Sequence, residues 1–179
     1  VDVYACQVPY QNNSKGSEEG ASLDSGHTHF LLVDNDAKGG WNSEVKMRAQ
    51  LEKKICDVYG ASGIQIVVQG SMGTLKTVGE SLEYRMMVVL VADSGGAAQL
   101  IAELIAPLLN EAVTSDTVWA KRVAEKLAEK DSKRRVEAIL KTRDELSEKS
   151  FGEIKDMLKR ICRRRECLVL FSFKDGGLA

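Results

Sequence analysis

Hydrophobic and polar positions alternate along this chain in blocks that predict strands followed by helices. Residues 64–69 (IQIVVQ) and 86–92 (MMVVLVA) are short β-branched apolar runs, typical of buried strands in a parallel sheet. Each run ends in a glycine-containing turn, and each turn precedes a segment with helical character. The order strand, turn, helix therefore occurs twice in succession, which favours an α/β fold with right-handed crossovers.

Further elements are predicted before this repeated unit. Residues 29–35 (HFLLVDN) form an apolar run that predicts a buried strand. Residues 43–59 carry apolar side chains at helical spacing and predict a helix, with Gly60 as its C-cap. The polar residues 1–26 predict at most a short strand, over 1–8, and then an irregular loop.

The chain becomes rich in charged residues after Pro107. Three helices are predicted there, over residues 118–130, 132–149 and 150–162. Ser150 and Glu153 form a capping-box pattern at the start of the third helix. Residues 167–173 (CLVLFSF) predict a last strand that returns to the sheet.

The predicted fold class is α/β with a mainly parallel sheet. We expect an α/β core over residues 1–113, and over residues 114–179 a helical segment with a closing strand that returns to that core. The pattern gives four clear strands and a weak fifth, whereas a doubly wound domain usually has five or six. Either the chain contains only the later strands of a larger fold, or a segment or partner outside it supplies the missing strands.

The composition excludes several classes of protein. The 179 residues are 44% hydrophobic and 28% charged, which is typical of a soluble globular protein. A net charge of −1 provides no general basic field for nucleic acid, and no apolar run approaches the ~20 residues of a membrane span. The four cysteines lack metal-ligand spacing and there are only two histidines, so we expect reduced thiols and no metal site.

The two glycine-containing turns carry the candidate binding chemistry. They consist of Gly70, Ser71, Met72, Gly73 and Thr74, and of Asp93, Ser94, Gly95 and Gly96. In a parallel sheet both turns lie at the carboxyl ends of neighbouring strands, where open α/β sheets bind ligands. Glycine allows close backbone approach, and the unpaired N–H groups at a helix start attract phosphate. Two such turns side by side predict a ligand with two phosphates.

Five segments of the chain, in order, carry a resemblance to a known family. They are LDSGHTHFLLVDN (23–35), EVKMRAQLEKKI (44–55) with Trp41 before it, GSMGTLKT (70–77), VVLVADSGGAAQLIAELI (88–105) and ICRRRECLVLF (161–171). Their order and spacing resemble the amino-terminal homology region of melastatin-type transient receptor potential (TRPM) channels. The resemblance covers roughly residues 8–177.

This resemblance implies a Rossmann-like SLOG domain on the cytoplasmic side of a membrane-embedded cation channel. In one branch of the family the domain binds ADP-ribose and supports opening of a calcium-permeable pore. The resemblance therefore implies ADP-ribose or a related nucleotide as the ligand. It also implies contact with the remainder of the channel polypeptide, and a homotetramer in the full-length protein.

Two residues of the predicted first helix region correspond to ligand-contacting positions of that branch. Trp41 stands where the branch has an aromatic residue that stacks on the ligand, as flat rings stack on bases; alternatively, it covers the sheet edge. Arg48 stands where the branch has an arginine that contacts the phosphates, which suits the bidentate guanidinium. The alternative for Arg48 is a structural salt bridge.

The two turns also correspond to positions of the family pattern. Gly73 and Thr74 match its phosphate-binding turn, although helix capping alone would also explain Thr74. Ser94, Gly95 and Gly96 match the second turn, but the ADP-ribose-gated branch has an arginine at position 96. Losing a charged hydrogen bond costs ~1.5–3 kcal/mol, so we expect binding to be weaker or differently posed.

The segment GSMGTLKT also resembles a motif of the SLOG phosphoribohydrolases, which ends in a catalytic glutamate. This chain has Thr77 at that position, and threonine is no general base near neutral pH. Glu80 and Glu83 would have to redirect to reach the site. We therefore predict a non-enzymatic nucleotide sensor, with two alternatives: a nucleotide-independent channel assembly domain, and a soluble phosphoribohydrolase.

Overall fold

The computed structural model of the chain describes residues 26–31, 33, 44–109, 116–141, 148–174 and 177–178. It separates into two compact units, Val1–Ser43 and Glu44–Ala179. In the first unit the described residues form neither helix nor strand, and the side chains of Phe30 and Leu31 are exposed. The predicted strand at 29–35 is therefore wrong for its described residues, because no described strand pairs with them. Trp41 and the predicted strand over 1–8 lie outside the described residues.

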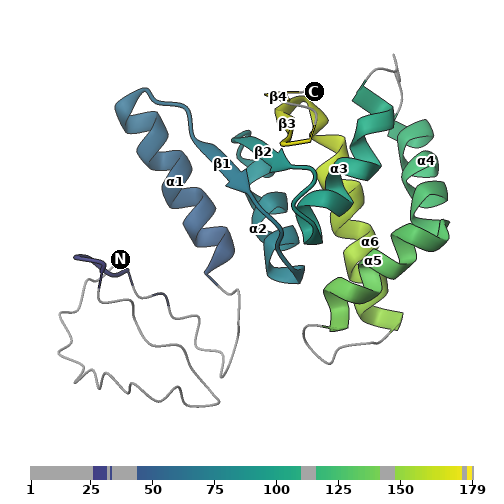
Figure 1. The fold of residues 1–179 in the computed structure, drawn as a ribbon. Helices are drawn as coiled ribbons and strands as arrows, with labels where there is room; N and C mark the ends of the chain where they lie inside the picture. The colour runs from purple at the N-terminus through teal and green to yellow at the C-terminus, as the bar shows by residue number, and fades with distance from the viewer. Residues whose placement is uncertain are drawn as a thin grey trace. The chain divides into compact units, whose positions relative to one another are not determined.

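The second unit is built on one four-stranded sheet (Figure 1). Its strands, in the order β1-β2-β3-β4, are β1 (Ile64–Val67), β2 (Met87–Val91), β3 (Leu168–Ser172) and β4 (Gly177–Leu178). The first three strands are parallel, with Val67 opposite Leu90 and Leu90 opposite Leu170. The short β4 pairs antiparallel with β3 and was not predicted. The expected α/β fold, with a mainly parallel sheet and a closing strand, is thus confirmed.

Six α-helices and one 3₁₀ turn accompany the sheet in the described part of the chain. They are α1 (Val45–Tyr59), α2 (Met72–Glu83), α3 (Gly96–Leu109), α4 (Asp116–Ala128), α5 (Lys130–Lys141), α6 (Glu148–Arg163) and η1 (Arg165–Cys167). The helix α1 ends as predicted at Gly60, whose φ is +60°. The predicted capping box at Ser150 is wrong, since α6 begins at Glu148. Glu148 and Lys149 are good helix formers and extend the helix upstream of the serine.

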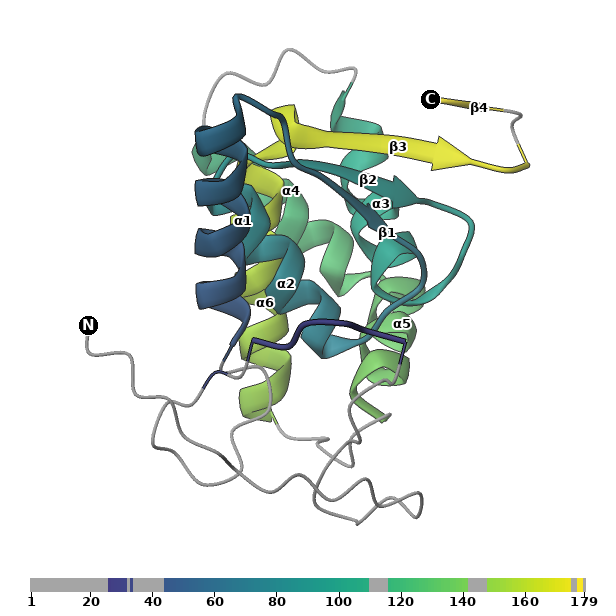
Figure 2. The same cartoon turned by 90° about the vertical axis from the view of Figure 1, so that its left-hand side faces the viewer.

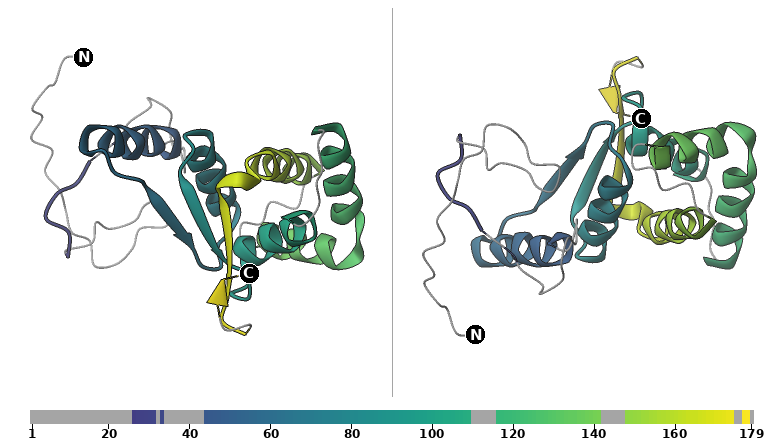
Figure 3. Two further views of the ribbon diagram at one scale, coloured as in Figure 1. Left: turned by 90° about the horizontal axis from the view of Figure 1, so that it is seen from above. Right: turned by 90° about the horizontal axis from the view of Figure 1, so that it is seen from below.

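The described helices leave one face of the parallel strands uncovered (Figure 2). Strand order advances in one direction, so right-handed crossovers place the connecting helices on the same side. Val88 and Leu90 point to the covered face and are fully buried, whereas Ile64 and Ile66 point the other way and are 63% and 69% exposed. The helices α4 and α5 pack against α3 and α6 and make no layer of their own on the sheet (Figure 3).

None of the described helices is long and apolar enough to cross a membrane.

Candidate functional site

The first glycine turn joins β1 to α2 and wraps closely around Thr74. Gly70 has a φ of +98°, and a Cβ built there would lie 2.5 Å from Thr74 Oγ1, so only glycine fits. The backbone N–H of Ser71 donates to Thr74 Oγ1 at 3.2 Å. Met72 and Gly73 open α2, so their N–H groups have no acceptor within the helix. The turn therefore forms a helix start that is fixed by Thr74 and carries donors suited to an anion.

The second glycine turn is hydrogen-bonded to the first. The N–H groups of Ala97 and Ala98, at the start of α3, donate to the carbonyls of Gly70 and Gln69 at 3.0 and 2.9 Å. In return the N–H of Gln69 donates to Ser94 Oγ at 2.8 Å, and that hydroxyl donates to the Val91 carbonyl at 2.7 Å. We call this set of bonds the turn–turn contact. It occupies two donors that were expected to face a phosphate.

Gly96 allows the two turns to meet. Its φ is +57°, and a Cβ built on it would lie 2.4 Å from the carbonyl oxygen of Gly70. No side chain fits there without moving the backbone. The arginine that the resemblance places at position 96 is therefore incompatible with the turn–turn contact. Gly95, by contrast, has φ +92° and nothing within 4 Å of a Cβ, so it faces open space.

Arg48 connects α1 to Thr77 in the second turn of α2. Its Nη2 donates to Thr77 Oγ1 at 2.9 Å, and the Thr77 hydroxyl donates to the Gly73 carbonyl at 3.1 Å. Glu44 and Glu52 approach the guanidinium only to 3.9 Å, and the side chain remains 43% exposed. The structure thus brings together Arg48 and Gly73, two predicted site residues that are far apart in the sequence, and leaves the guanidinium accessible.

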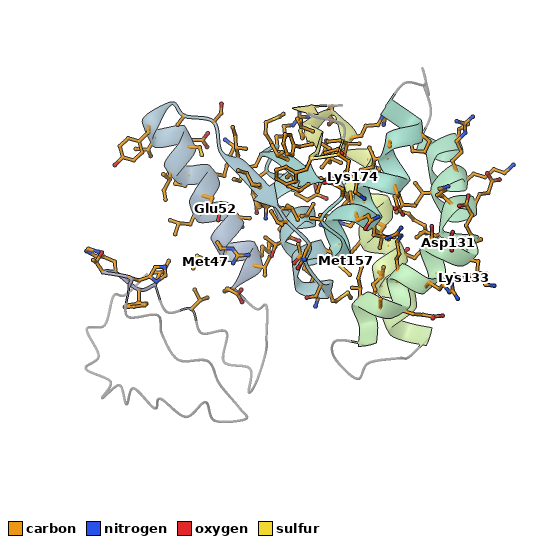
Figure 4. All side chains as sticks on the ribbon, in the orientation of Figure 1. Met47, Glu52, Asp131, Lys133, Met157 and Lys174 are labelled. Atoms are coloured by element: carbon orange, nitrogen blue, oxygen red, sulfur yellow. The ribbon has the colours of Figure 1, made fainter. Side chains whose placement is uncertain are left out.

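A groove of about 590 Å³ begins beside Arg48 and follows β1, the outer strand of the sheet. Its lining residues are Arg48, Glu52 (labelled in Figure 4), Ile55, Cys56, Gly63, Ile64, Gln65, Thr77 and Met86. This volume lies within the ~300–1,000 Å³ that is typical of small-molecule sites. Gln65 Oε1 is buried and has no hydrogen-bond partner among the described residues. The groove combines one cation, a carboxylate 3.9 Å from it, an unsatisfied acceptor and apolar walls.

The carboxylates of α2 face away from this groove. Glu80 and Glu83 lie 3.4 and 3.3 Å from Arg160 of α6, whereas Thr77 faces Arg48. In the described chain, the carboxylates beside the arginine are therefore those of Glu44 and Glu52, each 3.9 Å from the guanidinium, and none comes from α2. The same part of the chain holds no group of three histidine, cysteine or acidic side chains that could bind a metal.

Asp93 has a structural role that the sequence did not indicate. Its Oδ2 accepts the Lys174 N–H at 3.0 Å and approaches Ser172 Oγ at 3.5 Å (Lys174 is labelled in Figure 4). Desolvation alone would raise the pKa of Asp93, but the backbone N–H groups of Lys174 and Phe173 outweigh it and hold the pKa below its ordinary value. The carboxylate clamps the end of β2 to the turn after β3. The only feature of the sequence that could have indicated this role is the position of an acidic residue directly after a predicted strand.

The described cysteines are free thiols. Cys56 lines the groove, whereas Cys162 is buried inside α6, and burial raises its pKa to about 12. Cys167 is also buried, and desolvation raises its pKa as well.

Comparison with known proteins shows what the chain is similar to. The model of the family described as SLOG in TRPM matches residues 3–152. Transient receptor potential cation channel subfamily M member 2 of Rattus norvegicus is 31% identical over 114 residues, which cover 59% of this chain and 8% of the relative.

Two invertebrate relatives cover more of the chain. A subfamily M member-like 2 channel of Nematostella vectensis is 24% identical over 160 residues, 84% of this chain and 10% of the relative. A transient receptor potential channel of Caenorhabditis elegans is 28% identical over 183 residues, 95% of this chain and 8% of the relative. The chain thus spans a tenth or less of the length of these relatives.

Proposed function

Because this chain belongs to the family of SLOG domains in TRPM channels, we propose that it is a ligand-sensing domain on the cytoplasmic side of such a channel. Its ligand is a nucleotide such as ADP-ribose. Binding favours one arrangement of the domain relative to the remainder of the channel polypeptide, and so shifts the gating equilibrium. The full-length protein acts as a homotetramer.

The observation that carries this proposal is the hydrogen bond from Arg48 to Thr77, which links the guanidinium through the threonine hydroxyl to Gly73 at the start of α2. The guanidinium is held by Thr77, whose hydroxyl in turn bonds the Gly73 carbonyl. An accessible cation thus stands beside a helix start, and both features favour a phosphate. Trp41 keeps its assignment from the resemblance as the aromatic residue that stacks on the base.

The domain releases its ligand unchanged. Hydrolysis of an N-glycosidic bond needs a carboxylate to stabilise the developing positive charge. Thr77 occupies the position of that carboxylate in the family motif, and Glu80 and Glu83 are paired with Arg160 of α6. Recovery of intact ADP-ribose after prolonged incubation with the protein is the expected result.

Calorimetric titration with ADP-ribose, beside AMP and NAD, tests the proposal. Removing a charged hydrogen bond costs ~1.5–3 kcal/mol, so Arg48→Ala is expected to weaken binding roughly 10- to 150-fold. Lys53→Ala is the matched control, because Lys53 lies on the same helix, is 40% exposed, and pairs with Asp57. Equal weakening by both variants would show that general charge, and not Arg48, is responsible.

A nucleotide-independent assembly domain is the second candidate. The uncovered sheet face favours it, because parallel sheets are normally covered on both sides and Ile64, Ile66 and Val68 are all at least 60% exposed. This alternative predicts that the folded protein gives no heat of binding and no change in melting temperature with any nucleotide. Saturable binding that depends on Arg48 would exclude it.

A further inference from the structure

The start of α3 is capped in an unusual way. The N–H groups of the second and third residues of a helix normally bond to the side chain of the N-cap residue. Gly95, which precedes α3, has no side chain. The carbonyls of Gly70 and Gln69 take over this role, accepting from Ala97 and Ala98 at 3.0 and 2.9 Å. Two of the donors that could bind an anion at the start of α3 are therefore satisfied within the protein.

The turn–turn contact is held from both sides. Ser94 Oγ accepts the N–H of Gln69 and donates to Val91, which fixes the second turn against the first. Gln69 adopts a φ of +57°, a conformation that costs a residue with a Cβ free energy and persists where the surroundings fix it. Both its N–H and its carbonyl are bonded to the second turn or to α3.

We propose that Gly96 is a specificity-determining residue of this domain. By permitting the turn–turn contact, Gly96 closes the second turn to phosphate. A phosphoryl group therefore binds at the start of α2 and not at the start of α3. This inference rests on the proposed function and narrows its ligand class. A nucleotide needs a single phosphate at the first turn, and a second phosphate makes no contact with the start of α3.

Nuclear magnetic resonance of the isotopically labelled 179-residue chain tests this without assuming that a nucleotide binds. In the free protein, the amides of Ala97 and Ala98 should be protected from hydrogen exchange, because they are bonded to the carbonyls of Gly70 and Gln69. The amides of Met72 and Gly73, at the equivalent start of α2, should exchange rapidly. Rapid exchange at Ala97 and Ala98 would overturn the proposal, whether or not nucleotides bind.

Titration with AMP and with ADP-ribose then tests the specificity. Both ligands should shift the amide signals of Met72 and Gly73 and leave those of Ala97 and Ala98 in place. Shifts at Ala97 and Ala98 as large as those at Gly73 would refute the proposal. If neither ligand shifts any signal, the proposed function fails, and the exchange experiment still decides whether the contact exists.

Variants of the contact complete the test. Ser94→Ala removes the two hydrogen bonds of the Ser94 hydroxyl, and Gly96→Ala forces the turns apart. Opening the contact should raise the affinity for ADP-ribose relative to AMP by roughly tenfold, the value of one charge-assisted hydrogen bond. Ser132→Ala, a buried serine of α5, is the control and should leave this ratio unchanged. An unchanged ratio in a folded variant whose Ala97 and Ala98 amides have lost their protection from hydrogen exchange would contradict the inference.

Discussion

Replacing Gly70 with alanine tests the geometry on which the first turn depends. The new methyl group would lie 2.5 to 2.7 Å from the Oγ1, Cγ2 and Cβ atoms of Thr74, at a φ of +98°. A positive φ costs a residue with a Cβ ~1–2 kcal/mol, and overpacking costs a further ~1–3 kcal/mol. We expect the free energy of unfolding to fall by about 2–5 kcal/mol, a large part of the ~5–15 kcal/mol of a typical domain.

Gly95→Ala separates the two contributions. Gly95 has a similar φ of +92° but nothing within 4 Å of a Cβ, so this variant should lose only the ~1–2 kcal/mol of the backbone term. Urea unfolding followed by circular dichroism measures both variants. Equal losses in the two would refute the steric argument at Thr74, and no loss at Gly70 would refute the turn geometry itself.

Two further predictions follow from ionisable groups. The pKa of Asp93 is lowered on folding. Its contribution to stability is therefore present above the unfolded pKa of ~3.9 and is lost as the pH falls through the folded pKa. When urea unfolding is measured between pH 6 and pH 2, the free energy of unfolding should fall less in Asp93→Asn than in the parent. In a Cys6→Ser background, Cys56 should react with a thiol reagent in the native protein before Cys162, whose pKa of about 12 keeps it protonated. If adding Cys56→Ser to that background leaves the reaction rate unchanged, the prediction is contradicted.

The two glycine turns are joined by direct hydrogen bonds. Ser94, Gly95 and Gly96 were candidates for a second phosphate subsite because they form a turn between a strand and a helix. In the structure the Ser94 hydroxyl bonds to Gln69 and Val91, and the N–H groups of Ala97 and Ala98, which follow the turn, bond to Gly70 and Gln69. Gly96 therefore has two effects. It lacks the charge of an arginine, and it permits a contact that a side chain would prevent.

The sequence alone determined the repeated strand–turn–helix units, the end of α1 at Gly60 and the return of the closing strand. Each of these features depends on a short stretch of the sequence. A β-branched run, a glycine at the end of a helix, or apolar side chains at helical spacing each restrict the backbone within a few residues. The family resemblance arose in the same way, from short segments in a fixed order.

The tertiary structure decided which of the candidate site residues meet. The bond from Arg48 to Thr77 spans 29 positions, that from Gln69 to Ser94 spans 25, and the clamp from Asp93 to Lys174 spans 81. A helix start looks the same in the sequence whether its N–H groups face solvent, a phosphate or another carbonyl. Only the position of the neighbouring backbone determines which acceptor is present, and that position depends on how β1 and β2 pair and how their two turns pack.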